Sequence, residues 1–225
     1  MNYAVKFATL ISLLLLFLGC SKDDSFELNQ SEVLLHYDEG FVFNLQGASN
    51  VEWSSSDEFV GTIGQNGNFS AKHIGETEVT AKSGSRTFTA IVRVEPYITD
   101  IIEPVLKYGV YSETIRNEET REFISEDASQ VRFMGQGERE YRVYYNLRNG
   151  VVDNSVIVFT PKENLRDELS VFFGERYELI ENTAERMTYI NKEKTIGINI
   201  QATFAVGVHA TWVPSSYTVP ADNGK

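Results

Sequence analysis

The sequence predicts an all-β antiparallel sandwich followed by an α+β domain, in which an antiparallel sheet carries helices on one face. Before Pro96, short segments such as Phe88–Val94 alternate apolar and polar residues and end at turn residues. After Pro96, one segment has the apolar spacing of a helix and strand-like segments surround it. We therefore predict a sandwich over residues 27–96, an α+β domain over 97–214 and a flexible tail over 215–225.

Turn residues divide the first half into short strands. They form three groups: Asp38-Glu39-Gly40, Asn66-Gly67 and Ser83-Gly84-Ser85. Asn-Gly is the strongest of these signals because both residues tolerate the positive φ that a tight hairpin requires. Trp53 stands in one of the predicted strands, where we expect it to fill the core, with a ligand-stacking ring as the alternative.

A motif in residues 51–94 is similar to a known module. The positions that carry it are Trp53, Ser54, Ser55, Asn66, Gly67, Ala71, Gly75, Val79, Thr80 and Ala81. The pattern resembles the bacterial Ig-like group 2 domain, and the resemblance implies an Ig-like sandwich that acts as a spacer. One departure is Gly61, where that family usually has alanine.

The second half contains one clear helix pattern among strands. Leu165, Leu169, Phe172 and Phe173 share a helical face, Gly174 follows, and "TPKE" from Thr160 predicts the N-terminal cap. The predicted strands are Tyr141–Leu147, Val156–Phe159, Ile196–Ile200 and Val208–Trp212, with a turn at Asn149-Gly150.

The second half also shows signs of an internal duplication. Residues 121–134 align with residues 177–190 without a gap, and Ile124 matches Ile180. We interpret the domain as two α-β-β-β units, with the first helix near residues 112–119. This arrangement resembles beta-lactamase-inhibitor-like domains in topology alone, and topology implies no inhibitor function.

The N-terminus predicts export and lipidation. Residues 1–19 have the layout of a signal peptide, because an apolar run too short to span a bilayer ends in a small residue. Phe-Leu-Gly-Cys, ending at Cys20, resembles the bacterial lipobox, and the alternative is an unmodified cysteine. Several acyl chains on Cys20 would make a lasting membrane anchor, with residues 20–26 as a tether.

The residues after Cys20 bear on which membrane face carries the protein. Lys22, Asp23 and Asp24 resemble the acidic export signal of Bacteroidetes lipoproteins, which implies the outer face of the outer membrane. The periplasmic face is the alternative. The layout of lipobox, Ig-like module and a domain with "EPVLKYG" and "FFGERYELI" also resembles surface lipoproteins of that type, for which no activity is implied.

Composition limits the chemistry and the partners. The formal net charge of −12 disfavours nucleic acid as a partner. One cysteine excludes an internal disulfide, and the three histidines, His36, His73 and His209, lack metal-site spacing, so we expect no metal and no cofactor. Neighbouring acidic pairs such as Asp167-Glu168 are expected to be solvated, and no hydrolase motif appears, so we expect no enzyme.

Aromatic residues leave ligand binding open. The candidates for stacking on a sugar ring are Tyr97, Tyr108, Tyr111 and Trp212, each with core packing as its alternative. The leading hypothesis is a monomeric, non-catalytic surface lipoprotein that binds a glycan or a protein. A periplasm-facing structural or accessory subunit is the second hypothesis, and an enzyme is the third.

Overall fold

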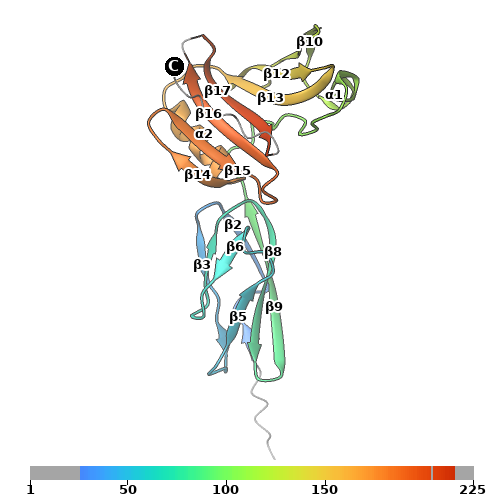
Figure 1. Ribbon diagram of the computed structural model, residues 1–225. Coiled ribbons are helices and arrows are strands. Elements are labelled where there is room, and N and C mark those ends of the chain that lie inside the picture. The colour runs from blue at the N-terminus through green and yellow to red at the C-terminus, as the bar shows by residue number, and fades with distance from the viewer. Residues whose placement is uncertain (1–25, 204, 216–225) are drawn as a thin grey trace, which may run out of the picture.

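The computed structural model describes residues 26–203 and 205–215 and contains two hydrophobic cores, one on each side of Pro96. Figure 1 shows the β-sandwich below and the α+β domain above it. Residues 1–25, which hold the predicted signal peptide and lipidation site, lie outside the described residues, as does almost all of the predicted tail.

The sandwich contains nine strands in antiparallel and parallel pairs. Their bounds are β1 (Glu27–Leu28), β2 (Glu32–His36), β3 (Gly40–Val42), β4 (Leu45–Gln46), β5 (Glu52–Ser55), β6 (Gly61–Ile63), β7 (Asn68–Ala71), β8 (Gly75–Ser83) and β9 (Arg86–Glu95). One sheet has the order β2-β9-β8-β5, with β2 parallel to β9, and the second has the order β3-β7-β6. A short β1-β4 pair completes the module.

The core of the sandwich holds the inward residues of both sheets. Trp53 is 7% exposed and packs against Phe43, with ring centroids 6.1 Å apart, so it fills the core as expected. Gly67 has a φ of 79°, and a Cβ there would lie 2.2 Å from the Phe43 carbonyl oxygen. The Asn66-Gly67 turn therefore requires glycine for its conformation and for the close approach of another backbone.

The α+β domain is built on one eight-stranded antiparallel sheet. Its strands are β10 (Phe123–Glu126), β11 (Gln130–Met134), β12 (Glu140–Arg148), β13 (Val151–Phe159), β14 (Glu178–Asn182), β15 (Arg186–Ile190), β16 (Ile196–Thr203) and β17 (Gly207–Pro214). The order is β10-β11-β12-β13-β17-β16-β15-β14, so β13 and β17 join the two halves at the centre. The fold class is the predicted one, an Ig-like β-sandwich followed by an α+β region.

Each half of this sheet repeats the same unit. A helix followed by four sequential strands occurs twice, which is one strand per unit more than predicted. The aligned segments 121–134 and 177–190 form the first hairpin of each unit, at opposite edges of the sheet. Both edge strands shift register at the equivalent position, Ile124 and Ile180. We predicted three strands per unit. Each unit instead contains two consecutive hairpins, β10–β11 with β12–β13 in the first and β14–β15 with β16–β17 in the second.

Two short helices lie on one face of the sheet. They are α1 (Ser112–Glu118) and α2 (Leu165–Gly174), and the four apolar residues that predicted α2 are all buried. The predicted capping at Thr160 was wrong: the N-cap of α2 is Asn164, four residues later, with a φ of 60°. A left-handed residue at this position stops the helix from extending back to Pro161.

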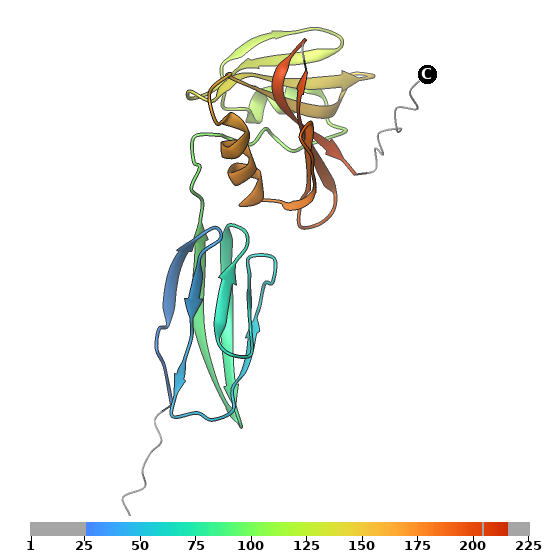
Figure 2. The ribbon, with the colours of Figure 1, turned by 90° about the vertical axis from the view of Figure 1, so that its left-hand side faces the viewer.

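An extended linker, residues 96–111, shares the helix side of the sheet (Figure 2). Val105 donates its backbone N–H to the Tyr145 hydroxyl at 2.7 Å, and Gly109 donates to the Val152 carbonyl at 2.8 Å. Ile98 and Ile101 contribute to the hydrophobic core of the α+β domain. The helices and the linker therefore cover one face, and the opposite face, which we call the open face, carries no helix.

Candidate functional site

Two of the four predicted ligand-binding aromatics pack against the core of the α+β domain, one fully and one partly. Trp212 is 0% exposed and donates its indole N–H to the Tyr177 hydroxyl at 3.1 Å. The Tyr108 hydroxyl lies 3.1 Å from the Ser155 hydroxyl, and burial raises the pKa of Tyr108. Trp212 packs in the core on the helix side of the sheet, which corrects its prediction as a binding residue, whereas Tyr108 is half-buried against the same core.

The other two predicted aromatics are exposed but lie apart. Tyr97 stacks on His36 in the sandwich, with ring centroids 4.7 Å apart, at the start of the linker. Tyr111 is 72% exposed and precedes α1. The structure therefore does not bring the four aromatics into one site. The lipidation residue Cys20 and the export residues Lys22, Asp23 and Asp24 lie outside the described residues.

A broad pocket lies on the open face of the sheet. This open-face pocket has a volume of about 600 Å³, within the size range of small-ligand sites. Its lining comes from β11, β12, β13, β17 and the loop between β16 and β17: Gln130, Arg132, Tyr141, Tyr144, Asn146, Asn154, Val156, Val158, Ala205, Val206, His209 and Thr211.

Strand register explains why these residues meet. Outward side chains on neighbouring strands form rows across the sheet, because alternate residues of a strand share a face. One row runs from Arg132 through Tyr144 and Val156 to Thr211. The parallel row begins with Gln130 and continues through Asn146 to Asn154.

The second row is a chain of side-chain amides. Gln130 donates from Nε2 to Asn146 Oδ1 at 2.8 Å, and Asn146 donates from Nδ2 to Asn154 Oδ1 at 2.6 Å. Asn154 donates in turn to Asp153 Oδ2 at 3.3 Å. Each amide is thus fixed in orientation, and the second N–H of each NH₂ group is left to another partner. We call these three residues the amide ladder.

The rest of the pocket is aromatic, apolar and weakly basic. Tyr141 is 54% exposed, and the Arg142 guanidinium lies 4.4 Å from the centre of its ring. Arg132 donates to Asp127 Oδ2 at 2.6 Å. Hydrogen bonds from Ser129, with a smaller contribution from Arg132, lower the pKa of Asp127. That carboxylate therefore stays ionised and keeps Arg132 in place beside the pocket.

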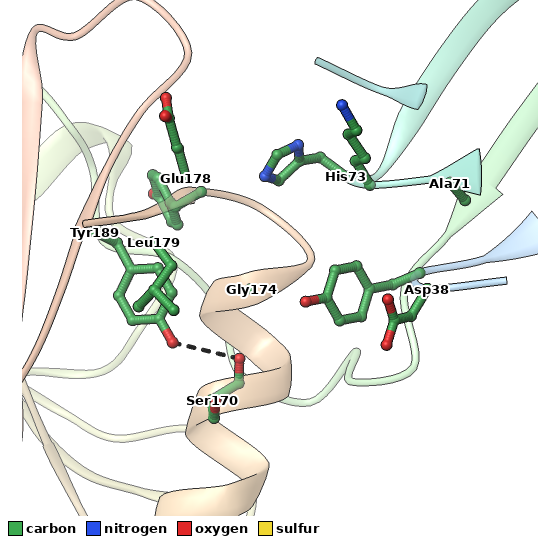
Figure 3. A pocket seen from close by; sticks show the side chains of 11 residues that line it. Asp38, Ala71, His73, Ser170, Gly174, Glu178, Leu179 and Tyr189 are labelled. Carbon is green, nitrogen blue, oxygen red and sulfur yellow. Dashed lines mark hydrogen bonds between the residues drawn. The ribbon is translucent and has the colours of Figure 1, made fainter. Parts of the chain in front are cut away.

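A second, smaller pocket lies between the two domains. It has a volume of about 290 Å³, and Figure 3 shows His73 pointing across it toward Glu178, with Asp38 on the sandwich side and Ser170 and Gly174 on α2. The Tyr37 hydroxyl lies so close to Gly174 that a Cβ there would be 2.9 Å from it. Tyr189 donates its hydroxyl hydrogen to the Ser170 carbonyl at 3.5 Å. This pocket belongs to the contact between the domains.

Glu175 is the centre of that contact. Its carboxylate is buried and accepts the backbone N–H of Tyr97 at 2.8 Å and of Ile98 at 3.3 Å. Its backbone carbonyl accepts the N–H of Ile74 from the sandwich at 2.7 Å. Arg176 also binds the Glu175 carboxylate and donates to the Ile98 carbonyl at 3.0 Å. Glu175 thus joins α2, the linker and the sandwich.

The described residues offer neither a metal centre nor a membrane-crossing helix. No group of three or more His, Cys, Asp or Glu side chains among them could hold a metal ion. Neither α1 nor α2 has the length and apolar run that crossing a bilayer requires.

Sequence reasoning did not find the open-face pocket. The available signal was the alternation of polar or aromatic residues with buried ones in three strands, for example Tyr144 and Asn146 on either side of Tyr145. Only the pairing of β13 with β17 places His209 and Thr211 beside them. That pairing joins distant parts of the chain and has no local sequence signature.

The architecture defines a two-part protein: an Ig-like β-sandwich followed by an α+β domain. Residues 42–94 match the model of the bacterial Ig-like domain (group 2), and they lie within the sandwich. A module of this family fits a surface or structural role. A search of curated proteins gives no match to this chain.

Two solved structures show weak likeness. Domains 5 and 6 of the S-layer protein SbsC align with 84% of this chain and 83% of their own, at 12% identity and a TM-score of 0.26. A quinonprotein alcohol dehydrogenase-like protein from Bacteroides thetaiotaomicron aligns with 84% of this chain, at 9% identity and a TM-score of 0.23. The alignment covers 47% of that second chain. With TM-scores this low, neither likeness supports a statement about function.

Proposed function

We propose that this protein is a non-catalytic, lipid-anchored lipoprotein of the outer membrane surface, in which the sandwich carries the α+β domain as a ligand-binding head. The lipobox at Cys20 supports the anchor, and the acidic residues after it support export to the surface. We further propose that the protein acts as a monomer and without a cofactor.

The observation that carries the proposal is the position of the two ends of the sandwich. Phe26 packs against Phe88 at a ring distance of 6.3 Å, near the start of β9, whereas the linker leaves the other end of that strand. Ten strand residues extend roughly 30 Å. The described chain therefore enters the sandwich at one end and leaves it for the α+β domain at the other, which supports an anchor and a head on opposite sides of the module (Figures 1 and 2).

The experiment is protease and antibody accessibility on intact cells, with a Cys20→Ala variant beside the wild type. We expect cleavage of the wild-type head on intact cells, and release of the variant from the membrane fraction. A wild type that is reached only after lysis would refute surface display and support the second candidate, a periplasm-facing accessory subunit. A variant that stays in the membrane would refute lipid anchoring.

A further inference from the structure

We propose that the open-face pocket binds an oligosaccharide. This inference rests on the proposed function of the α+β domain as a ligand-binding head. None of the four aromatics that the sequence suggested lines this pocket.

The charge of the pocket departs from the charge of the chain. The protein has 32 acidic residues against 20 lysines and arginines, yet none of the described residues that line the pocket is acidic. Arg132 and His209 are its ionisable bases. Such a lining is compatible with neutral sugars and with sugars that carry a carboxylate, and it disfavours basic peptides.

The polar groups are arranged to bind hydroxyl groups. A sugar hydroxyl both donates and accepts, so a suitable site presents donors and acceptors that are already fixed in orientation. The amide ladder does this, because each of its bonds holds one amide while free N–H groups stay available. The Tyr144 hydroxyl adds a group that forms no hydrogen bond with any described residue and can donate or accept.

The apolar groups suit the C–H face of a sugar ring. Tyr141 and Tyr144 provide aromatic surface, and Val156 and Val206 stand beside them. This apolar surface is interrupted by amides, so it does not form the continuous patch that an acyl chain or a large protein partner buries. Most of the exposed large hydrophobic residues, such as Phe123, lie elsewhere on the protein.

The buried end of the pocket is also ordered. His209 is 7% exposed, its Nδ1 lies 3.0 Å from the Gly207 carbonyl and its Nε2 lies 3.3 Å from Gln201 Nε2. An N–H at Nδ1 that donates to Gly207 leaves Nε2 to accept from the Gln201 amide. The ring is therefore held in one orientation, next to the β16–β17 loop that borders the pocket.

The test is binding of purified full-length protein to an array of immobilised oligosaccharides that includes neutral and carboxylate-bearing members, followed by calorimetry with the soluble form of each hit. We expect at least one hit, and we expect Asn146→Ala and Tyr144→Ala each to weaken it by about tenfold or more. Tyr144→Phe should keep the part of the affinity that depends on the ring.

Tyr111→Ala is the matched control, because it removes an exposed tyrosine of the same domain that lies outside the pocket. It should leave binding unchanged, and unfolding midpoints should show that every variant is folded. Absence of binding to all array members would overturn the proposal, as would binding that survives both pocket variants. Because the purified protein needs no anchor, glycan binding can hold even if surface display fails, and the reverse is also possible.

Discussion

A buried arginine bridge should contribute strongly to the stability of the α+β domain. Arg121 has a side chain that is 0% exposed and lies between two carboxylates. Its Nε and Nη2 donate to Glu140 at 2.8 and 3.0 Å, and its Nη1 donates to both oxygens of Glu119 at 2.9 and 3.0 Å. Burial alone would lower the pKa of Arg121, but the two carboxylates more than offset it and the pKa is raised.

The structure offers a matched pair for measuring this bridge. Arg93 in the sandwich also binds two carboxylates, those of Glu32 and Glu76, but its side chain is 51% exposed. Removing one partner of a buried ion pair costs about 3–5 kcal/mol, whereas an exposed pair contributes about 0–1 kcal/mol. We therefore expect Arg121→Leu to lower the unfolding free energy by about 3–5 kcal/mol and Arg93→Leu by about 1 kcal/mol or less.

Tryptophan fluorescence during urea unfolding separates the two domains. Trp53 reports on the sandwich and Trp212 on the α+β domain, so a Trp53→Phe background isolates the second signal. With an m-value of about 2 kcal/mol/M, Arg121→Leu should lower the midpoint of the Trp212 transition by about 1.5–2.5 M. Arg93→Leu, read from Trp53 in a Trp212→Phe background, should shift the sandwich transition by less than about 0.5 M. Equal small shifts for both variants would refute the reasoning.

Three further predictions follow from packing, domain contact and ionisation. A Cβ on Gly61 would lie 2.2 Å from the Phe69 ring, so Gly61→Ala should destabilise the sandwich by about 1–3 kcal/mol. The same substitution in a Phe69→Leu background should cost less, and urea unfolding measures both values. Glu175→Ala removes the acceptor of two linker N–H groups, and limited proteolysis should show faster cleavage in the linker, with unchanged cleavage as the contrary result. Burial, with nearby carboxylates, raises the pKa of Tyr145 and Tyr177 above the ordinary 10.0, so the folded state keeps protons that the unfolded chain releases. Stability should therefore fall as the pH rises above 10, and the tyrosinate absorbance of these buried tyrosines should appear together with unfolding rather than before it.

Local patterns predicted the elements of this fold well. The spacing of Leu165, Leu169, Phe172 and Phe173 predicted α2, and all four are buried. Turn chemistry predicted hairpins such as Asn66-Gly67. The start of α2 was wrong, because Asn164 adopts a left-handed conformation that the capping pattern at Thr160 gave no reason to expect.

The residues of the open-face pocket could not be predicted in the same way. Trp212 alternates in phase with Val208 and Ala210, which indicates a shared face but does not say whether that face is covered. The linker and the two helices decide this, because they cover the face that contains Trp212 and leave the face that contains Thr211 open. Which aromatic residues reach solvent is therefore a property of the assembled sheet.

The departure at Gly61 shows how a local substitution and the core are coupled. The resemblance to the Ig-like module implies alanine at this position, whereas here the Phe69 ring occupies the space that a methyl group would fill. Phe69 is 2% exposed and pairs with Ile63 across β6 and β7. Gly61 and Phe69 therefore depend on each other for packing, and replacing only one of them should lower the stability of the sandwich.

The two motifs "EPVLKYG" and "FFGERYELI" acquire a shared physical role. The first lies in the linker and the second includes the end of α2, and the Tyr177 hydroxyl donates to Glu103 between them. Glu175 and Arg176 bind the linker backbone at Tyr97 and Ile98. Together these contacts attach the head to the sandwich on the helix side of the sheet, which leaves the open face free to meet a ligand. A separation of this kind between attachment and the open face is what the proposed ligand-binding head would require.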